Sequence, residues 1–223
     1  MALNINGTTG ISGVDGSVSA PALTGTDSNT GITFPAADTI KFSTGGVERM
    51  SITNNGLSST GHVLQVVQGI KTSRQSFSGA NNFQDMGLGC NLTPSSASNK
   101  VLVMINISAT TNLNTPGFFT LCRGGSDISP SDTSTFSQLA IGDAEGSRTR
   151  CSTQVHHIDN DNDIQNVNVF FLDSPNSTSA VHYEAFLRTD GSGIIYINGT
   201  KGNADNVGHG RTASTIIAME IAG

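Results

Sequence analysis

The sequence contains few aromatic residues and few charged ones. It has no tryptophan and two tyrosines, and charged residues make up 13% of its 223 positions. Aromatic platforms on which sugars could stack are therefore scarce. Only 11 residues are basic, they are scattered along the chain, and the formal net charge is −6. Because phosphate contacts need clustered lysine and arginine, we expect no nucleic-acid partner and no anionic membrane surface.

Long hydrophobic runs and paired cysteines are also missing. The longest apolar stretches, such as Val101–Ile107, are too short to cross a bilayer, and no charged segment followed by an apolar run opens the chain. We therefore expect no membrane insertion and no secretory signal. The three cysteines, Cys90, Cys122 and Cys151, are widely spaced and odd in number. This pattern predicts buried free thiols rather than a metal site or a disulfide framework.

Signatures of catalysis are absent as well. The sequence has no G-x-S-x-G elbow, H-E-x-x-H helix, P-loop or dinucleotide fingerprint. Acid pairs such as Asp143 with Glu145, or Glu184 with Asp190, are expected by chance among 17 acidic residues. We predict a protein that is not an enzyme, with no catalytic, cofactor-binding or metal-binding residues. A polysaccharide-cleaving activity is the disfavoured alternative.

The most site-like cluster is His156–Asp163, in which carboxylates alternate with asparagines. Its spacing lacks the glycine and the glutamate that an EF-hand loop requires. We interpret it as a polar hairpin tip between strands expected at Gln154–Ile158 and Asn166–Leu172. The alternative is a metal ion held on a trimer axis by three copies of His156 or His157.

What the sequence does contain is typical of β-structure. Glycine, serine, threonine and asparagine dominate, β-branched residues are plentiful, and no segment keeps a 3.6-residue period. Asp190–Gly193 has the composition of a hairpin turn. We predict an all-β fold with an antiparallel, jelly-roll-like β-sandwich. The expected strands are His62–Gln68, Phe83–Leu88, Lys100–Ser108, Phe118–Arg123, Gln154–Ile158, Asn166–Leu172, Val181–Arg188, Gly193–Asn198 and Thr215–Ile221.

The strand expected at Lys100–Ser108 shows how the sandwich could be buried on both sides. Its odd-numbered positions are all apolar valines and isoleucines, whereas its even-numbered positions are half polar. This suits one face on the core and a second face partly covered by a neighbouring subunit. Phe118–Phe119 and Phe170–Phe171 are expected in the core and at subunit interfaces.

The chain divides into three expected parts. Residues 1–30 have no apolar periodicity and should form an extended arm that gains order by lying on another molecule. Residues 31–61 contain very short β-like runs that cannot bury their apolar face alone, so we expect a short intertwined β neck formed with other copies of the chain. Residues 62–223 should form the sandwich head. Its long polar loops, Gly124–Arg150 and Gly199–Thr212, are the expected recognition surface.

Charged residues in the expected neck have two interpretations. Lys41, Glu48 and Arg49 would meet their own copies in a trimer and form ion pairs between subunits. Alternatively, they are solvated charges on an exposed edge that discourage aggregation.

Several phrases resemble bacteriophage tail-fibre and trimeric virion fibre proteins of the marine and cyanobacterial phage type. The resemblance covers most of the chain, and the order of the phrases is more specific than any one of them. They are GITFPAADTIKFSTGGVERMSI (Gly31–Ile52), VLQVVQ (Val63–Gln68), LTPSSASNKVLV (Leu92–Val103), LDSPNSTSA (Leu172–Ala180) and STIIAMEIA (Ser214–Ala222).

The resemblance implies a homotrimer in the virion, assembled in the host cytoplasm. Residues 1–30 would attach to other virion proteins, of the tail or the capsid. The C-terminal head would bind a host-surface glycan or protein through its loops. The alternative is a trimeric capsid decoration or cement protein, or a head fibre, that stabilises the capsid.

Overall fold

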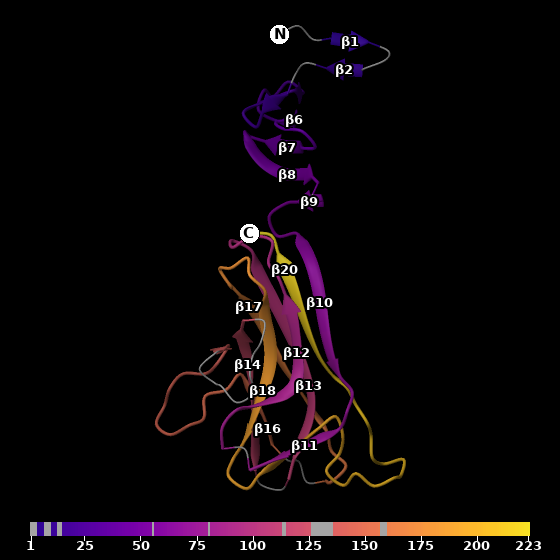
Figure 1. Ribbon diagram of the computed structural model, residues 1–223, viewed down its shortest axis with the longest axis vertical. Coiled ribbons are helices and arrows are strands. Elements are labelled where there is room, and N and C mark those ends of the chain that lie inside the picture. Colours follow the sequence, from indigo (N-terminus) through magenta and orange to yellow (C-terminus); the bar gives the residue numbers. More distant parts are fainter. Residues whose placement is uncertain are drawn as a thin grey trace. The chain divides into compact units, whose positions relative to one another are not determined.

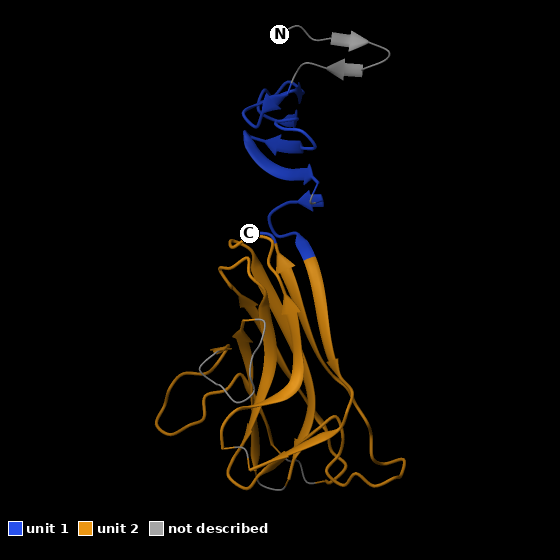
Figure 2. Ribbon diagram, in the orientation of Figure 1, with its two compact units in different colours: residues 1–64, 222–223 blue, residues 65–221 orange. Residues whose placement is uncertain are grey.

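The computed structural model describes residues 4–6, 10–12, 15–54, 56–79, 81–112, 115–125, 136–156 and 160–223, with side chains from residue 15 onward. All regular structure in these residues is β-strand (Figure 1). The chain forms two compact units, unit 1 with residues 1–64 and 222–223, and unit 2 with residues 65–221 (Figure 2).

Unit 1 is built from short strands. Its main feature is a five-stranded antiparallel sheet in the order β5-β6-β7-β8-β9, while β1 pairs with β2 and β3 with β4. Gly45 and Gly46 make the turn between β7 and β8 with φ of 61° and 73°, values that favour glycine. The strands are β1 (Asn4–Asn6), β2 (Gly10–Ser12), β3 (Gly16–Ser17), β4 (Ala20–Pro21), β5 (Leu23–Thr24), β6 (Gly31–Thr33), β7 (Ile40–Thr44), β8 (Val47–Thr53) and β9 (Gly56–Ser58).

Unit 2 contains two larger antiparallel sheets. The first has the order β10-β20-β13-β19-β11, with β17 on the opposite edge of β13, and the second has the order β12-β18-β14-β15, with β16 also on β14. The expectation of an all-β antiparallel sandwich is confirmed. The strands are β10 (Val63–Lys71), β11 (Gln75–Ser78), β12 (Gln84–Leu92), β13 (Lys100–Thr111), β14 (Pro116–Gly124), β15 (Phe136–Leu139), β16 (Thr153–His156), β17 (Gln165–Asp173), β18 (Val181–Thr189), β19 (Ile194–Ile197) and β20 (Ser214–Ile221).

The hydrophobic core lies between the two sheets of unit 2. On β13 the odd-numbered residues from Val101 to Ile107 are buried, as their alternation predicts, and the even-numbered side faces outward. Tyr183, Phe119 and Met86 contribute the largest side chains from the second sheet to this core. The core therefore joins strands that are far apart in sequence.

Two expected hairpins are wrong. Asp190–Gly193 does form a turn, with Gly191 at φ 55°, but it follows β18 of the second sheet and precedes β19 of the first. Likewise β16 pairs with β14, whereas β17 pairs with β13 in the other sheet. Turn residues reverse the chain locally, but the choice of pairing partner depends on which sheet offers a free edge.

The expected loop Gly124–Arg150 is also corrected, because β15 lies within it and pairs with β14. Phe136 of β15 contacts Phe186, with ring centroids 4.5 Å apart. The sequence did not predict β15, because one aromatic residue in a polar segment does not produce the alternating pattern of a strand. Residues 126–135 of this loop lie outside the described part of the chain. The functional division at residues 30 and 61 stays a prediction.

Candidate functional site

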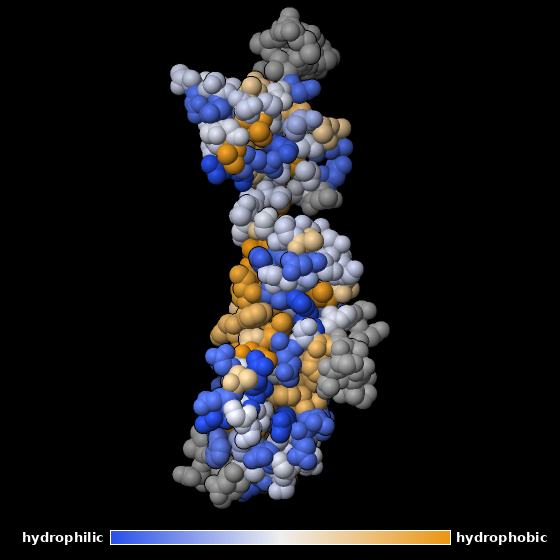
Figure 3. Space-filling model, turned by 90° about the vertical axis from the view of Figure 1, so that its left-hand side faces the viewer, coloured by the Kyte–Doolittle hydropathy of each residue, from blue (hydrophilic) through white to orange (hydrophobic). Residues whose placement is uncertain are grey.

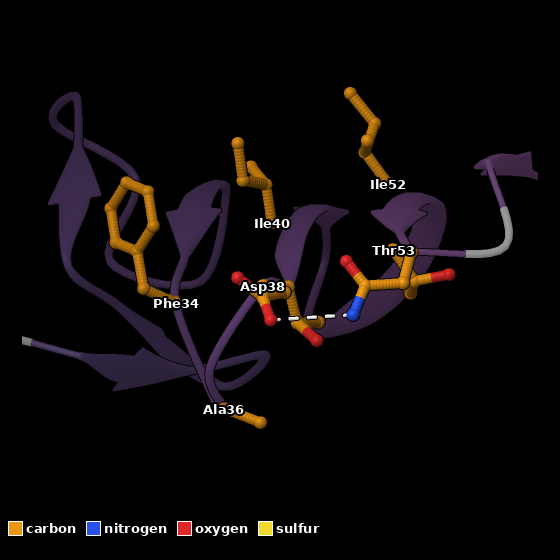
Figure 4. A pocket seen from close by; sticks show the side chains of 8 residues that line it. Phe34, Ala36, Asp38, Ile40, Ile52 and Thr53 are labelled. Carbon is orange, nitrogen blue, oxygen red and sulfur yellow. Dashed lines mark hydrogen bonds between the residues drawn. The ribbon is translucent and has the colours of Figure 1, made fainter.

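One side of the β5–β9 sheet in unit 1 is lined by apolar side chains. Directly paired residues share a face of an antiparallel sheet, so the register places these side chains on the same side. Phe34, Ile40 and Ile52 point in the same direction in Figure 4. We call this surface the unit 1 apolar face; it comprises Leu23, Ile32, Phe34, Ile40, Phe42, Met50, Ile52 and Leu57.

The unit 1 apolar face is exposed, whereas the other side of the same sheet carries polar side chains, some of them buried. Leu23, Phe34, Ile52 and Leu57 retain 38–45% exposure, and the remaining members are half-buried. Thr33, Ser43 and Ser51 on the opposite side are buried, the hydroxyl of Thr33 without a hydrogen-bond partner. No valine, leucine, isoleucine, phenylalanine or methionine among the described residues of unit 1 is buried. A single chain therefore gives unit 1 no apolar core.

A hollow of about 450 Å³ lies on this unit (Figure 4). Phe34, Ile40 and Ile52 line it together with a polar rim, where the Asn54 amide donates to Asp38 Oδ2 at 3.3 Å. The hollow offers few polar groups. Its described lining includes apolar side chains and one amide–carboxylate pair. It suits side chains of another β surface better than a reacting substrate.

Lys41 and Glu48 lie on the polar side of the unit 1 sheet, because Lys41 pairs with Thr33 and Ser51 and Glu48 pairs with Ser43. The Lys41 ammonium donates to Glu48 Oε2 at 2.6 Å within the same chain, and this hydrogen bond lowers the pKa of Glu48. The Arg49 Nε donates to Thr44 Oγ1 at 2.8 Å. Lys41 and Glu48 thus pair between β7 and β8, and an additional pairing between subunits stays a prediction.

The outer side of the first sheet of unit 2 carries a second apolar surface. Val66 and Ile70 of β10 and Phe170 and Leu172 of β17 are 54–67% exposed. Between these strands, Leu102 and Met104 of β13 pair with residues of β17 and β20. We call this surface the unit 2 apolar face; it comprises Val66, Ile70, Leu102, Met104, Phe170, Leu172, Ile217 and Met219.

The unit 2 apolar face covers only half of its sheet. Further along the same strands the outward residues become polar, and the Asn106 amide donates to Asn168 Oδ1 at 2.7 Å. In the view of Figure 3 unit 2 likewise has hydrophobic residues in its upper half and hydrophilic residues below. An apolar area beside a polar one is a property of interaction surfaces rather than of a uniformly solvated sheet. Phe171 packs on the core, whereas Phe170, expected in core or interface, is exposed here.

The carboxylate-rich segment, which we interpreted as a hairpin tip, is joined to the second polar loop. The Lys201 ammonium donates to Asp161 Oδ1 at 2.7 Å, and the Gly202 N–H donates to Asp161 O at 3.1 Å. His156 is exposed, and residues 157–159, including His157, lie outside the described part. Within the described residues no three histidine, cysteine or acidic side chains are grouped to hold a metal ion.

The thiol prediction is confirmed in part. All three cysteines are free, and Cys90 and Cys122 are buried, but Cys151 is half-exposed. Burial raises the pKa of Cys90 to about 11 and also raises the pKa of Cys122. These thiols are therefore protonated and packed at neutral pH.

One buried acid of unit 2, Asp173, links the two sheets of the sandwich. Arg123 Nη1 donates to both carboxylate oxygens of Asp173 at 2.7 Å, and the Tyr183 hydroxyl donates to Asp173 Oδ2 at 2.7 Å. Asp173 belongs to β17 of the first sheet, and both partners belong to strands of the second. This carboxylate links the sheets. The described residues contain no helix long and apolar enough to cross a membrane.

Comparisons with known proteins add little to this geometry. No protein-family model matches the sequence, and no curated protein matches it. Solved structures with some likeness come from infectious bursal disease virus: the Gx strain (12% identity, TM-score 0.32, covering 74% of this chain and 39% of that chain) and the Gt strain (12%, 0.31, 83% and 48%). The VP2 subviral particle is a third (10%, 0.33, 83% and 47%). The chain spans less than half the length of these proteins, and at such scores the likeness carries no argument.

Proposed function

We propose that this chain is a non-enzymatic structural protein of a bacteriophage particle that works as a homotrimer. Residues 1–30 attach it to other virion proteins, and the loops of unit 2 bind a host-surface glycan or protein. The observation that carries the proposal is the unit 1 apolar face, an exposed hydrophobic sheet surface whose reverse side carries polar side chains. The phrase Gly31–Ile52, which resembles phage fibre proteins, forms the strands that present this face.

Self-association is the economical way to cover the unit 1 apolar face. Fully burying a large apolar side chain is worth about 1.5–3 kcal/mol, so burying the exposed part of Leu23, Phe34, Ile52 and Leu57 contributes roughly 1 kcal/mol each. Several copies packed around one axis would give unit 1 the core that it lacks. The unit 2 apolar face offers a second, separate area for contact between copies. A closed ring of three copies leaves none of these faces open.

Sedimentation velocity at micromolar concentration tests the assembly. We expect a trimer for the natural chain and a monomer for Ile52→Asp, because three carboxylates would be buried on the apolar contact. Ile52 is 41% exposed in the single chain, so the substitution leaves the fold of one copy intact. Val207→Asp is the matched control, since Val207 is fully exposed in a loop of unit 2. A monomeric natural chain would refute the assembly.

The position on the particle separates adhesion from capsid decoration. Antibody labelling of particles in electron micrographs should place the protein at the tail if it is an adhesin. Particles that lack the protein should then remain intact and fail to adsorb to the host. Label over the capsid, with fragile particles that still adsorb, would replace the adhesin by a decoration or cement protein.

A further inference from the structure

The loop between β19 and β20 is held in a defined conformation at its base. The Asn198 amide donates to Lys71 O at 2.7 Å and to Ser73 O at 3.3 Å, and Gly199 forms an isolated β-bridge with Arg211. Asn198 and Asn203 adopt left-handed backbone conformations, with φ of 58° and 51°. Residues outside glycine adopt this region at an energetic cost that the surrounding contacts must offset. The two ends of the loop are thus fixed against β10 and the turn that follows it.

Two arginines from different segments meet at Gly199. Arg74 Cδ and Arg211 Nη1 each lie 2.7 Å from the point where a Cβ of residue 199 would be. A Cβ here would force the two side chains to shift, so glycine leaves them room for this approach. Arg74 donates from Nε and Nη2 to Thr200 O, at 3.3 and 3.1 Å, and its guanidinium lies 5.1 Å from the centre of the Tyr196 ring. Arg211 donates from Nη2 to Asn203 Oδ1.

These neighbouring positive charges are not neutralised within the described chain. No carboxylate of the described residues lies within 4.0 Å of either guanidinium, although Lys201 in the same loop pairs with Asp161 at 2.7 Å. Both side chains are fixed by neutral oxygen acceptors, which leaves further N–H donors free on each fork. Two like charges held beside each other favour an anion that binds both.

We propose that Arg74 and Arg211 form an oxyanion-binding site for a carboxylate- or sulfate-bearing polysaccharide. The guanidinium forks bind the acidic group of the sugar, and the amide and imidazole groups of the Gly199–Thr212 loop face the rest of the polymer. An overall charge of −6 disfavours a densely charged partner such as DNA, whereas a polymer with one charge per sugar or fewer is tolerated. This inference rests on the proposed function, because it takes the polysaccharide to be part of a host surface.

Binding of alginate, a polyuronate, to the full chain by biolayer interferometry tests the site. Arg211→Gln keeps a donor for Asn203 and removes the charge, and we expect the dissociation constant to rise at least about tenfold. Lys100→Gln is the charge-matched control, because Lys100 is exposed at the start of β13 and lies outside both long polar loops. Neutral dextran should not bind. Dextran sulfate in place of alginate shows whether sulfate serves as well as carboxylate.

Equal binding by Arg211→Gln and Lys100→Gln would overturn the proposal, and so would equal affinity for dextran. Inorganic sulfate should compete with alginate. Displacement of alginate at sulfate concentrations near the dissociation constant of sulfate supports an oxyanion-binding site. Circular dichroism confirms that Arg211→Gln is folded. Failure of this site and failure of the proposed function are distinguishable. A trimeric, particle-bound protein without Arg211-dependent binding refutes only the site, whereas a monomer with such binding refutes only the assembly.

Discussion

Replacement of Glu220 by glutamine tests how a buried charge stabilises the sandwich. Glu220 lies on β20 and is fully buried. Its Oε1 accepts hydrogen bonds from the Ser95 N–H at 2.6 Å, the Ser95 hydroxyl at 2.8 Å and the Asn99 amide at 2.6 Å. Its Oε2 accepts from Gln65 at 2.5 Å. One carboxylate thus joins β20, β10 and the turn between β12 and β13.

The magnitude follows from these four contacts. A glutamine keeps one carbonyl oxygen for Ser95 and Asn99, but its NH₂ group faces the Gln65 amide, which also donates to Thr93 O at 2.7 Å. Turning the Gln65 amide around would break that second contact. One hydrogen bond is lost and the others lose their charge assistance. Since charged hydrogen bonds are worth about 1 kcal/mol more than neutral ones, and relief of carboxylate burial offsets part of this, we expect a loss of about 2 kcal/mol.

The direction in which the pKa of Glu220 is shifted determines how its contribution to stability changes with pH. Burial by itself raises the pKa of Glu220, but the hydrogen bonds from Gln65, Asn99 and Ser95 outweigh burial, so the pKa lies below its ordinary value. This stabilisation is fully present above the unfolded pKa of about 4.3 and is lost as the pH falls through the lower folded pKa. The difference between the natural chain and Glu220→Gln should therefore shrink below about pH 4.

Urea unfolding followed by far-UV circular dichroism measures both quantities, at one fixed protein concentration because assembly adds to stability. Glu145→Gln is the control, since Glu145 is 74% exposed and should change the free energy of unfolding little. A Glu220→Gln chain as stable as the natural one at pH 7, or a difference that persists unchanged at pH 3, would refute the reasoning.

Two further predictions concern buried groups of unit 2. Glu184→Gln should have a higher urea midpoint than the natural chain at pH 7, and the difference between the two should be smaller at pH 4. Burial raises the pKa of Glu184, with Asp85 adding to the effect, so the charged form costs stability as the pH rises through the folded pKa; an equal gain at both pH values would contradict this. With a disulfide reagent at pH 8, Cys151 should react in the native protein, whereas Cys90 and Cys122 should react only after urea unfolding. Rapid labelling of Cys90 in the native protein would show that this thiol is accessible and not buried.

The candidate surfaces were only partly predictable from sequence. Short apolar runs around Ile40 and Ile52 indicated a sheet that one chain cannot bury, and the structure leaves that face exposed. The meeting of Arg74 with Arg211 carried no sequence signal. These residues are distant in sequence, and each alone resembles a solvated charge. Their proximity depends on Gly199, one glycine among 26.

The sequence by itself determined most strands of unit 2, the alternation of β13 and the all-β class, because side-chain direction in a strand has a period of two and is set locally. It missed the short strands β11 and β15. Tertiary structure decided which strands pair. The turn at Asp190–Gly193 and the segment between β16 and β17 both looked like hairpins, yet each carries the chain from one sheet to the other. Pairing partners are chosen by free sheet edges and by a shared core, and both arise only from residues far apart in the chain.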